Sequence, residues 1–121
     1  MATYNNIQPC ETYTTNTSLT TKQYTFVAYV GGVIVGPTLG QACIGVLQNA
    51  PAAGQVGSVA YTGSPMVYAG ATIAAGAVIS ADATGRATTA LTTHIGLGFA
   101  REAAVVGQLI KIDFNRGGNA V

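Results

Sequence analysis

A repeat within the chain is the feature that most constrains its fold. Residues 45–61, GVLQNAPAAGQVGSVAY, align without a gap on residues 98–114, GFAREAAVVGQLIKIDF, at a constant spacing of 53 positions. The repeated positions hold glycine, small and apolar residues, and the matched glycines are Gly45 with Gly98 and Gly54 with Gly107. A solenoid needs about three or more stacked units. Two copies therefore predict one domain built from two related halves.

Short β-strands broken by glycine and proline are expected from residue 24 onward. Gly31-Gly32 predicts a tight hairpin, because glycine adopts positive φ at both central positions of such a turn. Ile110 and Ile112 alternate with charged residues, the period-two pattern of a half-buried strand. Short strands at this spacing predict an all-β fold, a small β-barrel or sandwich of two pseudo-repeated halves at about 24–61 and 77–114.

The expected strands follow the same order in each half. Those of the first half are Tyr24–Val30, Val33–Val35, Ala42–Leu47 and Gln55–Tyr61. Those of the second half are Ala77–Ala81, Arg86–Ala90, Ile95–Arg101 and Gln108–Phe114. Gly85 follows Asp82 in the turn of the second half. We expect positive φ at Gly85, since only glycine adopts it at little cost.

The first 22 residues differ in composition from the rest of the chain. They are rich in threonine and cannot bury enough apolar area to order themselves. Their β-branched and aromatic residues nevertheless suit an extended strand. We therefore expect an extended N-terminal arm over residues 1–22, a β-domain over 23–114 and a C-terminal tail over 115–121. The arm residues expected to contact neighbouring subunits are Tyr4, Ile7, Tyr13 and Leu19.

The surface is expected to carry few charges. Only 7% of residues are charged, against about 25% in an ordinary soluble domain, and 49% are hydrophobic. This composition favours a chain whose exterior is covered by other protein. The alternative is a surface of uncharged polar residues. The longest apolar run, residues 26–35, is too short for a membrane helix, which needs about twenty residues.

No group of residues in the sequence points to catalysis or metal binding. The four carboxylates are scattered, and His94 has no other ligand at metal-binding spacing. The five Lys and Arg residues are dispersed, whereas a nucleic-acid surface shows a basic cluster. With no secretory signal, Cys10 and Cys43 are expected as free thiols in a reducing compartment. We predict no catalytic residue, no metal, no cofactor, and neither nucleic acid nor membrane as a partner.

One stretch carries a family resemblance. Residues 69–86, AGATIAAGAVISADATGR, are followed by IGLGFA at 95–100 and VGQLIKI at 106–112. Together they resemble the tailed-phage capsid decoration, or cement, proteins, and the likeness extends over residues 24–114. The resemblance implies a compact β-fold bound to the outside of an icosahedral head, usually as trimers at or near three-fold positions.

The expected function is therefore that of a structural virion protein which binds the outer surface of a phage head and stabilises it. The expected partners are the major capsid protein and further copies of this chain, with a homotrimer favoured and a dimer possible. Synthesis is expected in the host cytoplasm. A different reading is a virion-surface adhesion or glycan-binding module, for which Tyr61 and Tyr68 are candidates. An internal head or scaffold protein would more often be helical or strongly charged.

Overall fold

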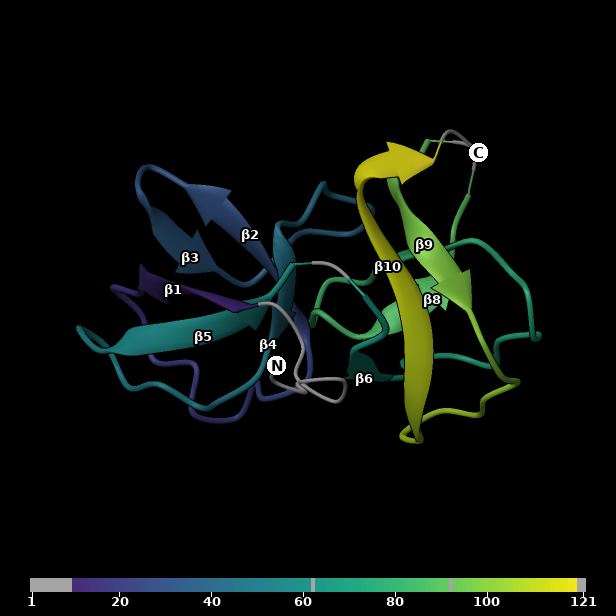
Figure 1. The fold of residues 1–121 in the computed structure, drawn as a ribbon, viewed down its shortest axis with the longest axis horizontal. Helices are drawn as coiled ribbons and strands as arrows, with labels where there is room; N and C mark the ends of the chain where they lie inside the picture. Colours follow the sequence, from purple (N-terminus) through teal and green to yellow (C-terminus); the bar gives the residue numbers. More distant parts are fainter. Residues whose placement is uncertain (1–9, 62, 92, 120–121) are drawn as a thin grey trace, which may run out of the picture.

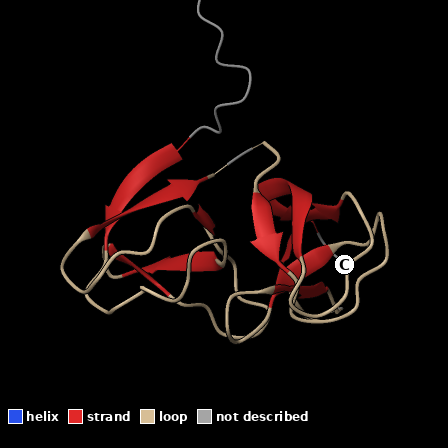
Figure 2. Cartoon of the chain, turned by 90° about the horizontal axis from the view of Figure 1, so that it is seen from below, coloured by secondary structure: helices blue, strands red, loops and turns tan. Residues whose placement is uncertain are grey.

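The computed structural model describes residues 10–61, 63–91 and 93–119. Within these ranges all regular secondary structure is β-strand, which confirms the predicted all-β class. The strands form two lobes side by side, β1–β5 in the first and β6–β10 in the second (Figure 1). Figure 2 shows the same two groups of strands from a second direction. The sheets do not close into a barrel, so of the two predicted architectures the sandwich is the one found.

The first lobe is one five-stranded antiparallel sheet with the order β1-β5-β4-β2-β3. Its strands are β1 (Cys10–Thr14), β2 (Phe26–Val30), β3 (Val33–Val35), β4 (Gly45–Leu47) and β5 (Val56–Ala60). Gly31 and Gly32 have φ of 65° and 86° and form the tight turn between β2 and β3. The sequence predicted the last four strands, and the first was expected only as part of an arm.

The second lobe holds a three-stranded sheet, β6-β10-β9, and a two-stranded sheet, β7-β8. Its strands are β6 (Met66–Tyr68), β7 (Ile79–Ala81), β8 (Ala87–Thr89), β9 (Gly96–Ala100) and β10 (Leu109–Asn119). An isolated pair between Val78 and Phe99 links β7 to β9. β10 continues past an irregularity after Phe114 as far as Asn119, where the sequence predicted a tail from residue 115.

The sequence repeat is also a repeat of strand pairing. Val46 pairs with Ala60 and Leu47 with Val59 between β4 and β5. Between β9 and β10 the pairs are Phe99 with Asp113 and Ala100 with Ile112, which are the same positions 53 residues later. The turns agree as well: Gln55 N–H donates to Ala52 O over 3.0 Å, and Gln108 N–H donates to Val105 O over 3.1 Å. The two halves therefore share both register and turn geometry.

Residues 10–22 complete the first lobe, which differs from the arm expected over residues 1–22. β1 pairs with β5 as β6 pairs with β10. After β1, Leu19 N–H donates to Pro51 O over 2.8 Å, and after β6, Ile73 N–H donates to Ala104 O over 2.9 Å. The segment needs no core of its own because β5 supplies hydrogen bonds and the first lobe buries Leu19. Residues 1–9 lie outside the described residues.

The lobes share one core across the seam between them. The first lobe has a cluster of its own, formed by Leu19, Val27, Ile34, Leu47 and Val59. The larger cluster holds the second lobe's buried residues, among them Ile73, Ile79, Ala87, Ala100 and Ile112. Phe26, Cys43 and Val46 of the first lobe also belong to it, and the Phe26 ring lies 6.1 Å from that of Phe114. The first lobe therefore packs one sheet face onto the core of the second.

Glycine is required where two segments of backbone approach closely. A Cβ at Gly45 would collide with the carbonyl oxygen of Ala60, and one at Gly98 would collide with that of Asp113. Gly85 has a φ of +87° and lies at the seam, where an added Cβ would come within 2.9 Å of Phe26 O. Gly85 O also accepts a hydrogen bond from Phe26 N–H over 2.7 Å. Gly85 therefore lets the β7–β8 turn contact the first lobe.

The position of Leu19 in the core can be tested by truncation. Leu19→Ala is expected to lower the free energy of unfolding by about 2–5 kcal/mol, because it opens a cavity at a side chain that is 3% exposed. The control is Leu39→Ala, which removes the same atoms from a side chain that is 59% exposed. Urea unfolding measures both. Equal, small effects would mean that residues 10–22 are not part of the folded domain.

The close approach of Gly85 to Phe26 O at the seam leads to a second prediction. Gly85→Val is expected to destabilise the fold by roughly 1–3 kcal/mol, through positive φ and the crowding of Phe26 O. Gly36→Val is the control, because Gly36 has open space around it and no positive φ. Thermal unfolding of the two variants compares them. A melting temperature for Gly85→Val equal to that of Gly36→Val would contradict the assigned turn.

Candidate contact surface

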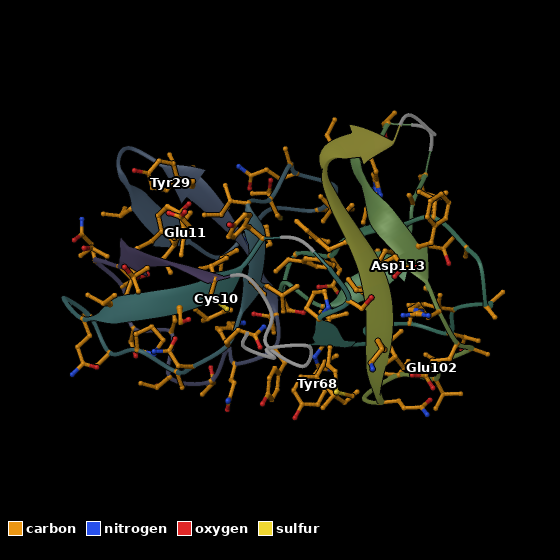
Figure 3. All side chains as sticks on the ribbon, in the orientation of Figure 1. Cys10, Glu11, Tyr29, Tyr68, Glu102 and Asp113 are labelled. Carbon is orange, nitrogen blue, oxygen red and sulfur yellow. The ribbon has the colours of Figure 1, made fainter. Side chains whose placement is uncertain are left out.

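The four predicted contact residues have different positions. Tyr13 is half-buried, and its ring meets that of Tyr29 edge-on, with 5.2 Å between the ring centroids. Leu19 is buried in the first lobe's core, so we no longer assign it to an intermolecular contact. Tyr4 and Ile7 lie outside the described residues. Figure 3 labels Cys10, Glu11 and Tyr29 on the first lobe.

Large apolar side chains are exposed on both lobes, more of them on the second. Those on the second lobe are Met66, Leu91, Ile95, Phe99, Val105 and Val106, and those on the first are Tyr29, Val30, Leu39 and Val56. The most exposed are Val106 at 61%, with Val105 and Leu91 at 60%. Val105 and Val106 are neighbours in the β9–β10 turn. The two valines make this turn one of the most apolar exposed points of the described surface.

The first lobe shows that the β9–β10 turn does not need valine. In the matching turn of the first lobe, the positions of Val105 and Val106 are Ala52 and Ala53. Ala52 N–H donates to the side-chain oxygen of Gln55 over 3.0 Å, and Val105 N–H donates to that of Gln108 over 3.1 Å. The two turns therefore have the same hydrogen bonds with different side chains. These hydrogen bonds therefore do not require the extra methyl groups of the second lobe.

Val46 and Phe99 are matched positions of the repeat on a sheet face, and their exposures differ. Val46 is fully buried at the seam, whereas its counterpart Phe99 is 43% exposed. Phe99 stands opposite Asp113 in the β9–β10 pairing, so their side chains share a face of the sheet. The first lobe covers this face by packing on the second lobe. On the second lobe the same face leaves an aromatic ring in contact with solvent.

Charged side chains stand beside Phe99. Arg101 Nη1 lies 3.7 Å from Asp113 Oδ1, and both groups reach Ser64 Oγ, at 3.1 Å and 2.9 Å respectively. The charged side chains of the pair are about half exposed, so the pair contributes little to stability. Glu102 and Asp113 are labelled on the second lobe in Figure 3. An apolar ring bordered by polar groups is the usual arrangement of a protein contact surface.

The buried polar groups have structural partners. His94 Nδ1 lies 2.8 Å from the Ser80 hydroxyl, and both side chains are buried. Burial raises the pKa of the Cys43 thiol to about 12, whereas Cys10 is exposed. Both cysteines are free. Across the described ranges, no three His, Cys, Asp or Glu side chains come together as a metal site.

The fold brings together two basic residues that appear dispersed in the sequence. Lys22 of the first lobe and Arg86 of the second line a cleft at the seam. Lys22 Nζ donates to Thr84 O over 3.3 Å, although the two residues are 62 positions apart in sequence. Sequence spacing carries no signal for this pair, because the contact depends on how the two lobes pack.

No helix in the described part of the chain is long and apolar enough to cross a membrane. The profile of the phage cement protein family matches residues 10–112, and this chain belongs to that family. It is a structural protein associated with the phage head.

A solved structure has the same fold. The N base of the head fiber protein gp8.5 of bacteriophage phi29 superposes with a TM-score of 0.75, covering 95% of this chain and 100% of that chain. The sequence identity is 20%, so this similarity describes the fold alone. No curated protein sequence matches the chain.

Proposed function

We propose that this protein binds the outer surface of the assembled icosahedral head and stabilises it by bridging neighbouring copies of the major capsid protein. Membership of the phage cement family supports capsid binding in general. A protein that binds only the assembled shell stabilises that shell by mass action. A chain with only 7% charged residues suits extensive contact with other protein.

The single observation that carries this proposal is the valine pair of the β9–β10 turn. Val105 and Val106 are about 60% exposed, and the matching turn of the first lobe has alanine at both positions. Each buried methylene contributes about 0.8 kcal/mol. A capsid surface that covers the two valines therefore gains binding energy which the alanine turn of the first lobe cannot supply.

The first nine residues form a second part of the proposal. β1 lies at the edge of its sheet, so residues 1–9 continue the chain from a sheet edge. We assign Tyr4 and Ile7 to contacts with a neighbouring capsid or decoration subunit, with the chain added to that subunit's sheet as an extended strand. Ordering each residue costs about 1–2 kcal/mol of backbone entropy, so these side chains have to bury apolar area.

We also propose that copies of this chain associate with one another on the virion. The low net charge of +1 does little to oppose association of identical chains. A homotrimer on the virion is favoured and a dimer is possible, with synthesis in the host cytoplasm. No catalytic role is assigned to the chain.

The adhesion or glycan-binding alternative receives less support. Tyr68 is half-buried and its ring lies 6.3 Å from that of Tyr24, across the seam. Tyr61 is also half-buried. A sugar-binding platform needs open aromatic faces, and neither candidate tyrosine is fully exposed.

The valine turn gives the first test of this proposal. The double variant Val105→Ala, Val106→Ala reproduces the alanines of the first lobe, so the fold and the melting temperature are expected to stay unchanged. Affinity for heads that lack the protein is expected to fall about tenfold or more, since about four buried methylene equivalents are lost. Sedimentation with purified heads measures it. Leu39→Ala is the matched control, and an affinity equal to wild type in the double variant would refute the valine contact.

Deletion of residues 1–9 gives the second test. β1 stays intact in this variant, so circular dichroism is expected to show the same β-structure as the full chain. Binding to heads and the heat resistance of decorated heads are both expected to fall. The comparison variant carries Tyr4→Ser and Ile7→Ser in the full-length chain. If both variants decorate heads with wild-type affinity, residues 1–9 make no capsid contact.

A further inference from the structure

A cleft lies at the seam between the lobes, lined by residues of both. It measures about 430 Å³ and is lined by Thr21, Lys22, Thr25, Thr84 and Arg86. Thr21, Lys22 and Thr25 lie in the segment just before β2 and form the first wall. Thr84 and Arg86 lie in the β7–β8 turn of the second lobe and form the second wall. None of these residues belongs to the exposed apolar side chains or to the valine turn that the proposed function uses.

The walls of the cleft are held in place before any ligand binds. Phe26 N–H donates to Gly85 O over 2.7 Å, which joins the two walls directly. On the first wall, the Thr25 hydroxyl donates to Lys22 O over 2.6 Å, and Thr25 is 5% exposed. A preformed site of this kind loses little conformational entropy when it binds a ligand.

The single carboxylate of the second wall is occupied within its own turn. Asp82 Oδ1 accepts hydrogen bonds from Thr84 N–H at 2.9 Å, from the Thr84 hydroxyl at 2.7 Å and from Arg86 N–H at 2.9 Å. Its other oxygen lies against Gly70, where a Cβ would collide with it. The Asp82 carboxylate therefore accepts its hydrogen bonds from residues of its own turn and stabilises that turn.

The two cations of the cleft keep donors available. Lys22 Nζ uses one of its three donors on Thr84 O, at 3.3 Å. Within the described ranges of the chain, the Arg86 guanidinium forms no ion pair. Arginine binds a carboxylate through two parallel N–H donors, and lysine adds a point charge beside it. Two basic groups on opposite walls of the cleft match the chemistry of one carboxylate.

We propose that this cleft binds a carboxylate, supplied by an Asp or Glu side chain of the major capsid protein. The inference rests on the proposed capsid binding and adds a second, polar contact on the seam. A protein carboxylate fits because the chain is a structural head protein, so the surface it meets is protein. The site fixes the orientation of the chain on the head, since both lobes have to hold the same side chain.

The test measures binding to heads that lack the protein. The double variant Lys22→Gln, Arg86→Gln is expected to bind about tenfold or more weakly at about 50 mM NaCl, with a smaller loss at about 300 mM NaCl because salt screens the contact. The charge-preserving variant Lys22→Arg, Arg86→Lys keeps both cations and is expected to lose less affinity. Lys111→Gln removes one positive charge outside the cleft, so it is the net-charge control for each single variant, Lys22→Gln and Arg86→Gln. Wild-type affinity and salt dependence in the double variant would overturn the inference.

A second measurement separates this inference from the proposed function. Sodium glutarate, a small dicarboxylate, is titrated into the free protein and followed by amide NMR. Saturable shifts at Lys22, Thr84 and Arg86, absent with matched NaCl and absent in the double variant, are expected. If glutarate produces no such shifts, the cleft is not a carboxylate site even where heads bind normally. If glutarate binds and wild-type protein binds hyaluronate but not heads, the carboxylate comes from an acidic polysaccharide and the capsid assignment is wrong.

Discussion

The packing of Phe26 and Val46 against the second lobe's core is the interaction on which the rest of the structure depends. The first lobe's own cluster is the smaller of the two, with Leu19, Val27, Ile34, Leu47 and Val59 buried and Tyr13 and Ile44 packed against them. The seam merges the two lobes into one core, with the Phe26 and Phe114 rings 6.1 Å apart. It also sets the relative position of the two lobes, and hence the cleft and the separation of the exposed turns.

The internal repeat provides a comparison that a domain without a repeat does not offer. Where the halves share backbone and side chain, as at Gly45 and Gly98, the residue is explained by close approach of two strands. Where they share backbone and differ in side chain, folding does not explain the difference. The valines at 105 and 106 and the exposed ring of Phe99 are of this second kind. These positions are the ones we assign to binding.

Sequence reasoning predicted the strands that alternate or repeat, missed β6, and expected β1 only as part of an extended arm. β1 and β6 each pair on one side only, so their residues need little apolar character, and the sequence did not show which strands they pair with. Leu19 was assigned to an arm because its burial depends on Pro51 and β5, far away in sequence. The seam cleft was unpredictable for the same reason, since Lys22 and Arg86 meet only after both lobes have packed.

A cryo-EM reconstruction of heads decorated with the full-length protein tests the central claim most directly. The account predicts density for this chain on the outer surface, with the Val105–Val106 turn buried against the major capsid protein and both lobes in the arrangement of Figure 1. Density in which that turn faces solvent while the capsid contacts lie elsewhere would contradict it, as would absence of the protein from the outer surface.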